Sequence, residues 1–301
     1  MTRSGLAAQP SPVVLPAAGG ATVTTGILWM LATTLLFVCQ DSTSRILLTS
    51  YPLTEVAFAR YFVHMVLVTG FVAWRDPRLL VSRRPMLQML RSGLLLGSTL
   101  FGMLALTMMH FLDYSAVVWV APVLVTALSV FLLGEKVRII GWLSVLAGMA
   151  GVWVIVSQAG IGLSPLMLIP LLAALCNALY QITTRMLHSS DPPLTTLFYS
   201  ALVGVAFCAA FLPFVGIAPK PMDLALMLLL GSLGAASHFC IIRAFSAAPA
   251  NIIAPFGYTS LLWATLVGMI VFSEIPNIQT MIGAGLIVAA GLATFLRARS
   301  A

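Results

Sequence analysis

Polar and aromatic side chains recur at three- and four-residue steps inside otherwise apolar stretches, and this spacing places them on one face of a helix. Three such faces are formed by Ser115, Trp119, Pro122, Thr126 and Ser129; by Asn177, Gln181 and Thr184 with Tyr180 beside them; and by Asn251, Pro255, Tyr258 and Thr265. These side chains could line a cavity for a small molecule, or they could hydrogen-bond neighbouring helices. We expect cavity lining above all for Trp119, Tyr258 and Trp263, because Pro122 and Pro255 lie close by and each frees a backbone carbonyl.

Ionisable side chains within the apolar stretches are the second group of candidates. Asp41 and Arg45 are four residues apart on one helix and can pair, while Arg60 and His64 share the next helix. One interpretation is a satisfied ion network near one mouth of the bundle. In the other, Arg60 contacts a substrate carboxylate or Asp41 carries a coupling proton. His64 and His238 could titrate near neutral pH or simply hydrogen-bond a neighbour.

The stretches that carry these residues are long and almost free of charge. Hydrophobic residues make up 60% of the chain and charged residues 8%, far from the balance of soluble domains. A bilayer core of about 30 Å needs about 20 helical residues to cross it. We therefore predict an all-α integral membrane protein with ten transmembrane helices at 24–45, 54–74, 88–108, 113–134, 139–157, 166–187, 194–214, 224–243, 250–271 and 276–296.

The net charge of +7 could suggest an anionic partner, but the arginines cluster at the ends of the predicted spans, which is a signal of membrane orientation. We therefore do not expect a nucleic-acid partner. With a cytoplasmic amino terminus, all but three of the 15 Lys and Arg residues fall on the cytoplasmic side, the exceptions being Arg45, Arg60 and Lys220. Both termini are thus predicted to be cytoplasmic, with residues 1–23 as a disordered tail. The four cysteines lie inside predicted spans without metal-ligand spacing, so we expect neither a metal site nor disulfides.

An internal repeat organises the spans into two halves. The series Thr43, Arg45, Leu47, Pro52 and Phe58 recurs as Thr183, Arg185, Leu187, Pro192 and Phe198, at a constant spacing of 140 residues. Each half, 24–157 and 166–297, holds five predicted spans. Because five is odd, the halves must have opposite orientations, which predicts two inverted five-helix repeats.

Short turns and small residues complete the pattern. Glu135 and Glu274 follow the predicted fourth and ninth helices and lie beside helix starts, where a carboxylate is expected to cap the helix. The fifth predicted helix places Gly141, Ser144, Gly148 and Gly151 on one face. Small residues let helices approach closely, so this face suits scaffolding or a homodimer contact, of which we favour scaffolding.

Several motifs resemble one family of transporters. They are Tyr114-Ser115-Ala116 leading to Pro122, then Leu133-Gly134-Glu135, and in the second half Ala254-Pro255-Phe256-Gly257-Tyr258 through Trp263 to Phe272-Ser273-Glu274. With Arg60 in the second helix, these resemble the EamA type of the drug/metabolite transporter superfamily over nearly the whole chain. Ser273 stands where the pattern usually has Gly. The resemblance implies a carrier of the bacterial cytoplasmic (inner) membrane, with a cavity between the repeats, that exports small metabolites. Exporters of amino acids, including aromatic ones, are prominent members.

Enzyme functions are disfavoured by the absence of known catalytic signatures. The sequence has no phosphate-binding GxxxxGK[ST] loop, no HExxH and no GxSxG, and we expect no catalytic residue and no cofactor. The predicted function is export of small metabolites, with amino acids as the leading substrate and alternating access as the mechanism. A channel-like pore, or export of a nucleoside, vitamin or drug-like compound, is the alternative. Membrane lipids are the other expected partner.

Overall fold

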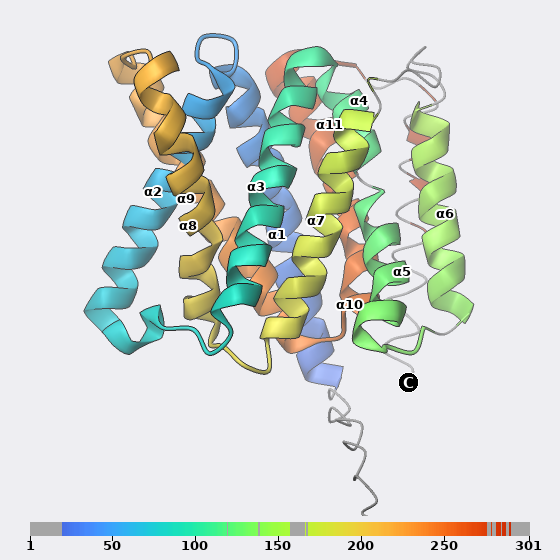
Figure 1. Ribbon diagram of the computed structural model, residues 1–301. Coiled ribbons are helices and arrows are strands. Elements are labelled where there is room, and N and C mark those ends of the chain that lie inside the picture. Colours follow the sequence, from blue (N-terminus) through green and yellow to red (C-terminus); the bar gives the residue numbers. More distant parts are fainter. Residues whose placement is uncertain are drawn as a thin grey trace, which may run out of the picture.

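The computed structural model describes residues 20–118, 120–137, 139–156, 166, 168–275, 278, 281–283, 285, 286 and 289. All regular structure in these residues is helical (Figure 1). The elements are α1 (Gly20–Leu47), α2 (Leu53–Arg75), η1 (Pro77–Leu80), α3 (Pro85–Met108), α4 (Phe111–Val118), α5 (Ala121–Leu133), α6 (Ile139–Val156), α7 (Leu168–Leu187), α8 (Pro193–Val215), α9 (Pro221–Ala247), α10 (Ala250–Ile253), η3 (Ala254–Tyr258) and α11 (Thr259–Phe272).

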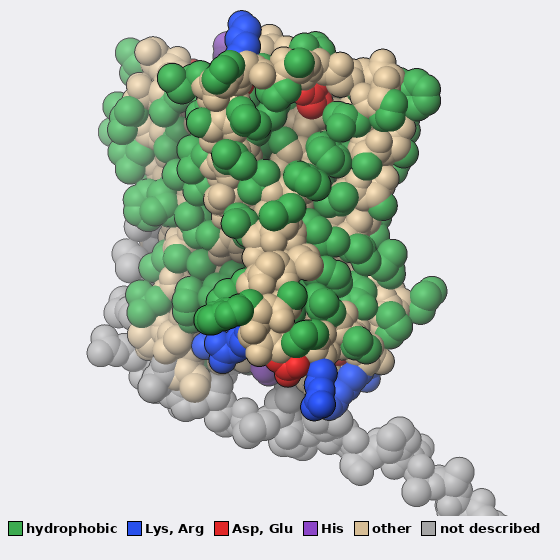
Figure 2. Space-filling model, turned by 90° about the vertical axis from the view of Figure 1, so that its left-hand side faces the viewer, with side chains coloured by type: hydrophobic (Ala, Val, Ile, Leu, Met, Phe, Trp, Pro, Cys, Tyr) green, Lys and Arg blue, Asp and Glu red, His purple; other side chains and the backbone are tan. Residues whose placement is uncertain are grey.

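The helices have the length and surface of membrane spans. Six of them are long and apolar enough to cross a bilayer: Thr22–Leu47, Leu53–Arg75, Pro85–Met108, Pro193–Val215, Pro221–Ala247 and Ala250–Phe272 taken as one. Figure 2 shows hydrophobic side chains across the middle of the visible face and Lys and Arg side chains at its two ends. The protein is therefore a multi-pass membrane protein. The predicted tail falls largely outside the described residues, as does much of the helix at 276–296, so the count of ten spans remains a prediction.

Two predicted helices are interrupted where they contain proline. The segment 113–134 is divided between α4 and α5, and the segment 250–271 contains α10, a 3-10 turn at η3 and α11. Pro122 and Pro255 each lie in the first turn of the element that follows an interruption. Proline has no N–H to donate and its ring clashes with the preceding turn, which favours an interruption of the helix at these positions.

Helices from the two predicted halves pack directly on each other. In Figure 1, α1 runs upward through the centre of the bundle, and its main partner is α9; α3 packs on α7, and α2 on α8 and α9. The two ends are named below as in Figure 1, the lower end being where α1 begins. Contacts between halves thus surround the middle of the bundle, where polar side chains meet.

Close packing on α6 depends on a glycine. An added Cβ at Gly148 would lie 2.5 Å from two carbons of the Tyr258 ring, which is far shorter than a van der Waals contact. Tyr258 itself is only 1% exposed, so its ring has little room to move. This contact supports the scaffolding role expected for the small-residue face of this helix.

We expect Gly148→Ala to lower thermal stability, because the new methyl group must displace the buried Tyr258 ring, at a cost of about 1–3 kcal/mol. The measurement is the melting temperature of purified protein in detergent. Gly70→Ala is the matched control, since no atom lies within 4 Å of the Cβ it would add on α2. A melting temperature of Gly148→Ala equal to that of the control would show that α6 does not pack as described.

Candidate functional site

A small cavity of about 50 Å³ lies at the centre of the bundle. Its polar lining consists of one carboxylate, one guanidinium, one phenol, one amide, one imidazole and two hydroxyls, from Asp41, Arg60, Tyr114, Asn177, His238, Ser98 and Thr99. Its apolar lining includes Phe37, Leu95, Met103 and Val118. These residues come from α1, α2, α3, α4, α7 and α9. Both predicted halves therefore contribute to one site.

The two opposite charges of the cavity, those of Asp41 and Arg60, do not form a salt bridge with each other. Asp41 accepts a hydrogen bond of 3.3 Å from the Tyr114 hydroxyl, and no nitrogen of Arg60 lies within 4.0 Å of its carboxylate. Arg60 is 7% exposed, and its Nε has no hydrogen-bond partner among the described residues. A buried charge without a full set of partners costs free energy, so this arrangement favours a ligand that supplies the missing contacts.

His238 joins the cavity to a second buried cation. The Tyr180 hydroxyl lies 2.9 Å from Nδ1 of His238 and 2.7 Å from Nη2 of Arg91. The Arg91 side chain is completely buried and also donates to Thr184 Oγ1 at 2.7 Å and Ser200 Oγ at 2.8 Å. Its guanidinium lies 4.4 Å from the centre of the Tyr180 ring. Oxygen acceptors and an aromatic face thus solvate this cation within the bundle.

The hydrogen-bonded network continues from Arg91 to the lower end of the bundle. Arg91 Nη1 donates to the Thr196 carbonyl at 3.2 Å, and Gln88 Nε2 donates to Thr196 Oγ1 at 3.2 Å and to Asp191 Oδ2 at 2.9 Å. Asp191, in the turn between α7 and α8, also accepts from Ser82 Oγ and from the backbone N–H of Arg83. This carboxylate therefore ties the chain before α3 to the start of α8.

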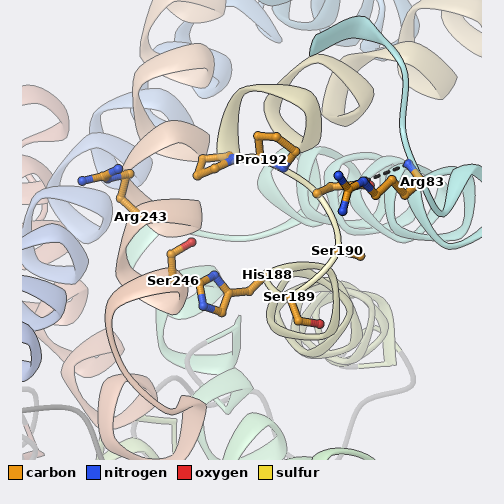
Figure 3. Close-up of a pocket in the computed structure, with 9 residues that line it drawn as sticks. Arg83, His188, Ser189, Ser190, Pro192, Arg243 and Ser246 are labelled. Atoms are coloured by element: carbon orange, nitrogen blue, oxygen red, sulfur yellow. Dashed lines mark hydrogen bonds between the residues drawn. The ribbon is translucent and has the colours of Figure 1, made fainter. Parts of the chain in front are cut away.

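Beside Asp191 the surface is hollowed over about 410 Å³ (Figure 3). Arg83 and Arg243 lie on opposite sides of this hollow, with His188 and Ser246 between them, and the guanidinium of Arg243 points away from it. Arg83, His188 and Arg243 are exposed. The hollow is open to its surroundings, whereas the central cavity is enclosed by helices, so we take the central cavity as the candidate site.

At each end of the bundle, a glutamate from one half of the chain accepts hydrogen bonds from a helix start of the other half. At the lower end, Glu135 accepts from the backbone N–H groups of Ala250 and Asn251 at 3.1 and 3.0 Å, and Arg185 Nε lies 3.6 Å from the same carboxylate. We call these groups the lower clamp. It joins the end of α5 to the start of α10.

The upper clamp repeats this arrangement with the roles of the halves exchanged. Glu274 lies 2.7 Å from Arg45 Nη1 and accepts from the backbone N–H groups of Phe111 and Leu112 at 3.4 and 3.3 Å. In both clamps the residue before the glutamate is left-handed, with φ of 66° at Gly134 and 55° at Ser273. Both glutamates cap helix starts, but these starts belong to the other half of the chain and not, as expected, to the helices beside them in the sequence. Arg45 was expected to pair with Asp41, but its ion pair in the structure is with Glu274.

The structure gathers part of the predicted site and places the rest elsewhere. Asn177, Arg60, His238 and Asp41 line the cavity; Gln181 donates to Asn177 at 3.3 Å, Tyr180 binds His238, and the ring of His64 stacks on that of His238 at 5.7 Å. Asn251 lies in the lower clamp, Tyr258 packs on Gly148, Pro122 begins α5, and Trp263 is partly buried among apolar side chains. Trp119 lies outside the described residues.

Two functional residues are not apparent from sequence patterns. Arg91 belongs by position to the cations at the lower end, yet it is buried between α3, α7 and α8. Tyr114 belongs to a family motif but does not share the helical face of Ser115 and Trp119. A hint for Arg91 is that it lies seven residues after Arg84, well within α3.

Comparison with known proteins identifies the family. The model of the EamA-like transporter family matches residues 24–157 and 164–296. The chain belongs to the EamA-like transporter family. It is thus a membrane transporter and not an enzyme, as the sequence predicts.

Named relatives of this transporter carry different substrates. It is 30% identical over 271 residues to the S-adenosylmethionine uptake transporter of Rickettsia prowazekii, covering 89% of this chain and 91% of that protein. It is 25% identical to the riboflavin transporter of Vibrio cholerae over 87% of this chain and 90% of that protein. A protein of known crystal structure has the same fold, with a TM-score of 0.73, 19% identity and coverage of 93% and 97%. None of these relatives supports the expected export of amino acids.

We expect the stability of this EamA-like transporter to fall in acid through Asp191. Burial alone would raise the pKa of this carboxyl, but hydrogen bonds from Ser82, Arg83 N–H and Gln88 outweigh it and hold the pKa below its usual value. The ionised form is therefore stabilised in the folded state. Its contribution is present above the unfolded pKa of about 3.9 and is lost as the pH falls through the lower, folded pKa.

Melting temperatures of the wild type and Asp191→Asn between pH 6 and pH 3 test this expectation. The wild type should be more stable at pH 6, and the difference should shrink below about pH 4, where the unfolded carboxyl titrates. Asp76→Asn is the control, because the Asp76 side chain accepts one bond from Arg78 N–H at the exposed start of η1. A difference between wild type and Asp191→Asn that is constant over this range would contradict the assignment.

Proposed function

We propose that this protein carries metabolites of the S-adenosylmethionine type across a bacterial inner membrane, binding them in the central cavity between Asp41 and Arg60. The observation that carries the proposal is the pair of opposite charges that face one enclosed cavity without being paired to each other. A substrate with a carboxylate and a cationic centre would supply a partner of opposite charge to both Arg60 and Asp41.

The chemistry of this substrate fits the lining. Its α-carboxylate would accept from the Arg60 guanidinium, while its ammonium or sulfonium would lie against Asp41. The carboxylate and the ammonium can form charge-assisted hydrogen bonds, which are among the strongest in proteins, whereas a sulfonium has no N–H to donate and would form only an ion pair with Asp41. The aromatic base would pack against the apolar side of the cavity, where Phe37 and His238 meet edge to face at 5.3 Å beside Met103.

The relatives support this choice over other small molecules. The S-adenosylmethionine uptake transporters share more identity with this chain than the riboflavin transporter of Vibrio cholerae does. Riboflavin has no cationic centre to meet Asp41. A free amino acid without an aromatic side chain would satisfy both charges but would leave the side of the cavity at Phe37 and His238 unfilled. Amino acids, including aromatic ones, and riboflavin are therefore competitors in the test below, and the direction of transport would follow the gradient.

Closure at both ends favours a carrier over an open pore. Sites for molecules of drug size commonly hold about 300–1,000 Å³, whereas this cavity holds about 50 Å³, and a clamp joins the two halves at each end of the bundle. The bundle must open to admit a substrate. The exchange of roles between the clamps supports two inverted repeats, 24–157 and 166–297, that open alternately with both termini in the cytoplasm.

Loss of either cavity charge should impair transport of S-adenosylmethionine. We expect Asp41→Asn and Arg60→Gln to raise the half-saturating concentration by about 10- to 100-fold, because each removes one charge-assisted hydrogen bond worth about 1.5–3 kcal/mol. Uptake of labelled substrate into proteoliposomes measures this. Asp76→Asn and Arg84→Gln, which change the same residue types outside the cavity, should transport normally.

Competition with unlabelled compounds identifies the substrate class. S-adenosylmethionine should compete best, and methionine, phenylalanine and riboflavin should compete weakly. The proposal fails if the wild type transports riboflavin or phenylalanine but not S-adenosylmethionine, or if both cavity variants transport normally. Counterflow exchange by Asp41→Asn with loss of uphill transport would assign Asp41 the coupling role considered above.

Weakening either clamp should open the cavity to water. In a protein without native cysteines, a cysteine at Ser98, which lines the cavity, should react with maleimide faster when Glu135→Gln or Glu274→Gln is added, because each substitution removes the charge that holds Arg185 or Arg45. Glu55→Gln is the control. Its carboxylate also accepts from a backbone N–H, that of Ile217, but it belongs to neither clamp. Equal labelling rates in all three variants would argue against gating by the clamps.

A further inference from the structure

His238 has one bonded ring nitrogen and one that is not bonded. Its Nδ1 lies 2.9 Å from the Tyr180 hydroxyl, whereas its Nε2 is buried and has no hydrogen-bond partner among the described residues. The residue is 1% exposed and lines the central cavity. A buried ring nitrogen without a partner costs free energy unless something else binds it.

The hydrogens of this network can be assigned from chemistry. A guanidinium can only donate, so the Tyr180 oxygen accepts from Arg91. The single hydrogen of the hydroxyl is then free to be donated to His238, with Nδ1 as the acceptor. An imidazole whose Nδ1 accepts carries its hydrogen on Nε2. The unbonded nitrogen is therefore an N–H donor.

We propose that Arg91 and Tyr180 hold His238 in the tautomer with hydrogen on Nε2, and that this N–H recognises a hydrogen-bond acceptor of the substrate. The proposal rests on the proposed function for the site but adds a third polar contact to those of Asp41 and Arg60. His238 contacts the substrate, whereas Tyr180 and Arg91 are positioning residues that act through it.

The surrounding contacts keep this donor in place. The His238 ring stacks on His64 at 5.7 Å and meets Phe37 edge to face, so it is enclosed on both sides. Arg91 is fixed by four oxygen acceptors from α7 and α8, one of which is the Tyr180 hydroxyl oxygen. A preorganised donor loses little entropy when the substrate binds.

Two substitutions of His238 separate recognition from packing. A glutamine side chain can place an N–H near the position of Nε2, whereas asparagine reaches only as far as Nδ1. His238→Gln should keep the half-saturating concentration for S-adenosylmethionine within about threefold of the wild type, and His238→Asn should raise it about tenfold, the effect of one lost hydrogen bond of about 1.4 kcal/mol. Equal and large losses in both variants would overturn the recognition role.

The tautomer is tested without any substrate. In protein labelled with ¹⁵N-histidine, the His238 signals should show hydrogen on Nε2, and Tyr180→Phe should shift them towards the other tautomer or a mixture. His64→Gln serves to assign the signals. A wild-type spectrum with hydrogen on Nδ1, or no change in Tyr180→Phe, would overturn the positioning role even if S-adenosylmethionine is transported. The expected spectrum in a protein that transports another substrate would leave the positioning role standing and reject only the proposed function.

Competition assays then locate the substrate atom that accepts this hydrogen bond. If His238→Asn weakens inhibition by adenosine but not by methionine, the acceptor is on the adenosine part; the reverse result places it on the amino-acid part. Unchanged inhibition by both compounds would contradict substrate recognition by Nε2.

Discussion

A bilayer cannot solvate charge, and this constraint determines how the interior of the protein is arranged. Asp41, Arg60 and Arg91 all lie on helices long and apolar enough to span a membrane, so each must find its partners inside the bundle. Arg91 finds them in a set of oxygens on α7 and α8. Arg60 does not find them completely, since its Nε has no hydrogen-bond partner among the described residues, and it faces the central cavity together with Asp41.

The same constraint explains how the ends are closed. The first turn of a helix inside a membrane protein has backbone N–H groups that need acceptors. A carboxylate from elsewhere in the chain accepts these hydrogen bonds, and its negative charge interacts favourably with the positive end of the helix dipole. Glu135 and Glu274 do this across the boundary between the halves, each beside an arginine. Close to the two helices whose N–H groups donate, α4 and α10, the helical segment is interrupted, with Pro122 and Pro255 in the first turn of the next piece. Opening one clamp therefore requires few bonds to break.

Much of the fold is predictable from sequence because apolar length and proline act locally. The spans at 24–45, 54–74 and 194–214 are found within a few residues as α1, α2 and α8. Glu135 and Glu274 could be recognised as helix caps because a turn and a helix start adjoin them in the sequence. The partner helices could not be predicted, since the carboxylates cap helices that are more than 100 residues away.

The site was predictable only in part, for a similar reason. Asn177, Arg60 and His238 stand out as polar residues in apolar stretches, and all three line the cavity. Arg91 does not stand out, because a cation near the start of a span usually marks the membrane surface. Its burial follows from Tyr180, Thr184 and Ser200, which belong to two distant helices. Asp41 and Arg45 have the right spacing to pair along one helix. Arg45 instead pairs at 2.7 Å with Glu274, a residue of the other half that the spacing within one helix could not indicate.

The central claim is that substrate binds between Asp41 and Arg60, and a structure of the purified transporter with S-adenosylmethionine bound tests it most directly. The account predicts ligand density inside an enlarged central cavity, with its carboxylate on Arg60, its cationic part facing Asp41 and an acceptor atom within hydrogen-bond distance of His238 Nε2. Ligand density in the surface hollow beside Arg83, with the central cavity still closed and empty in a preparation that transports the compound, would contradict it.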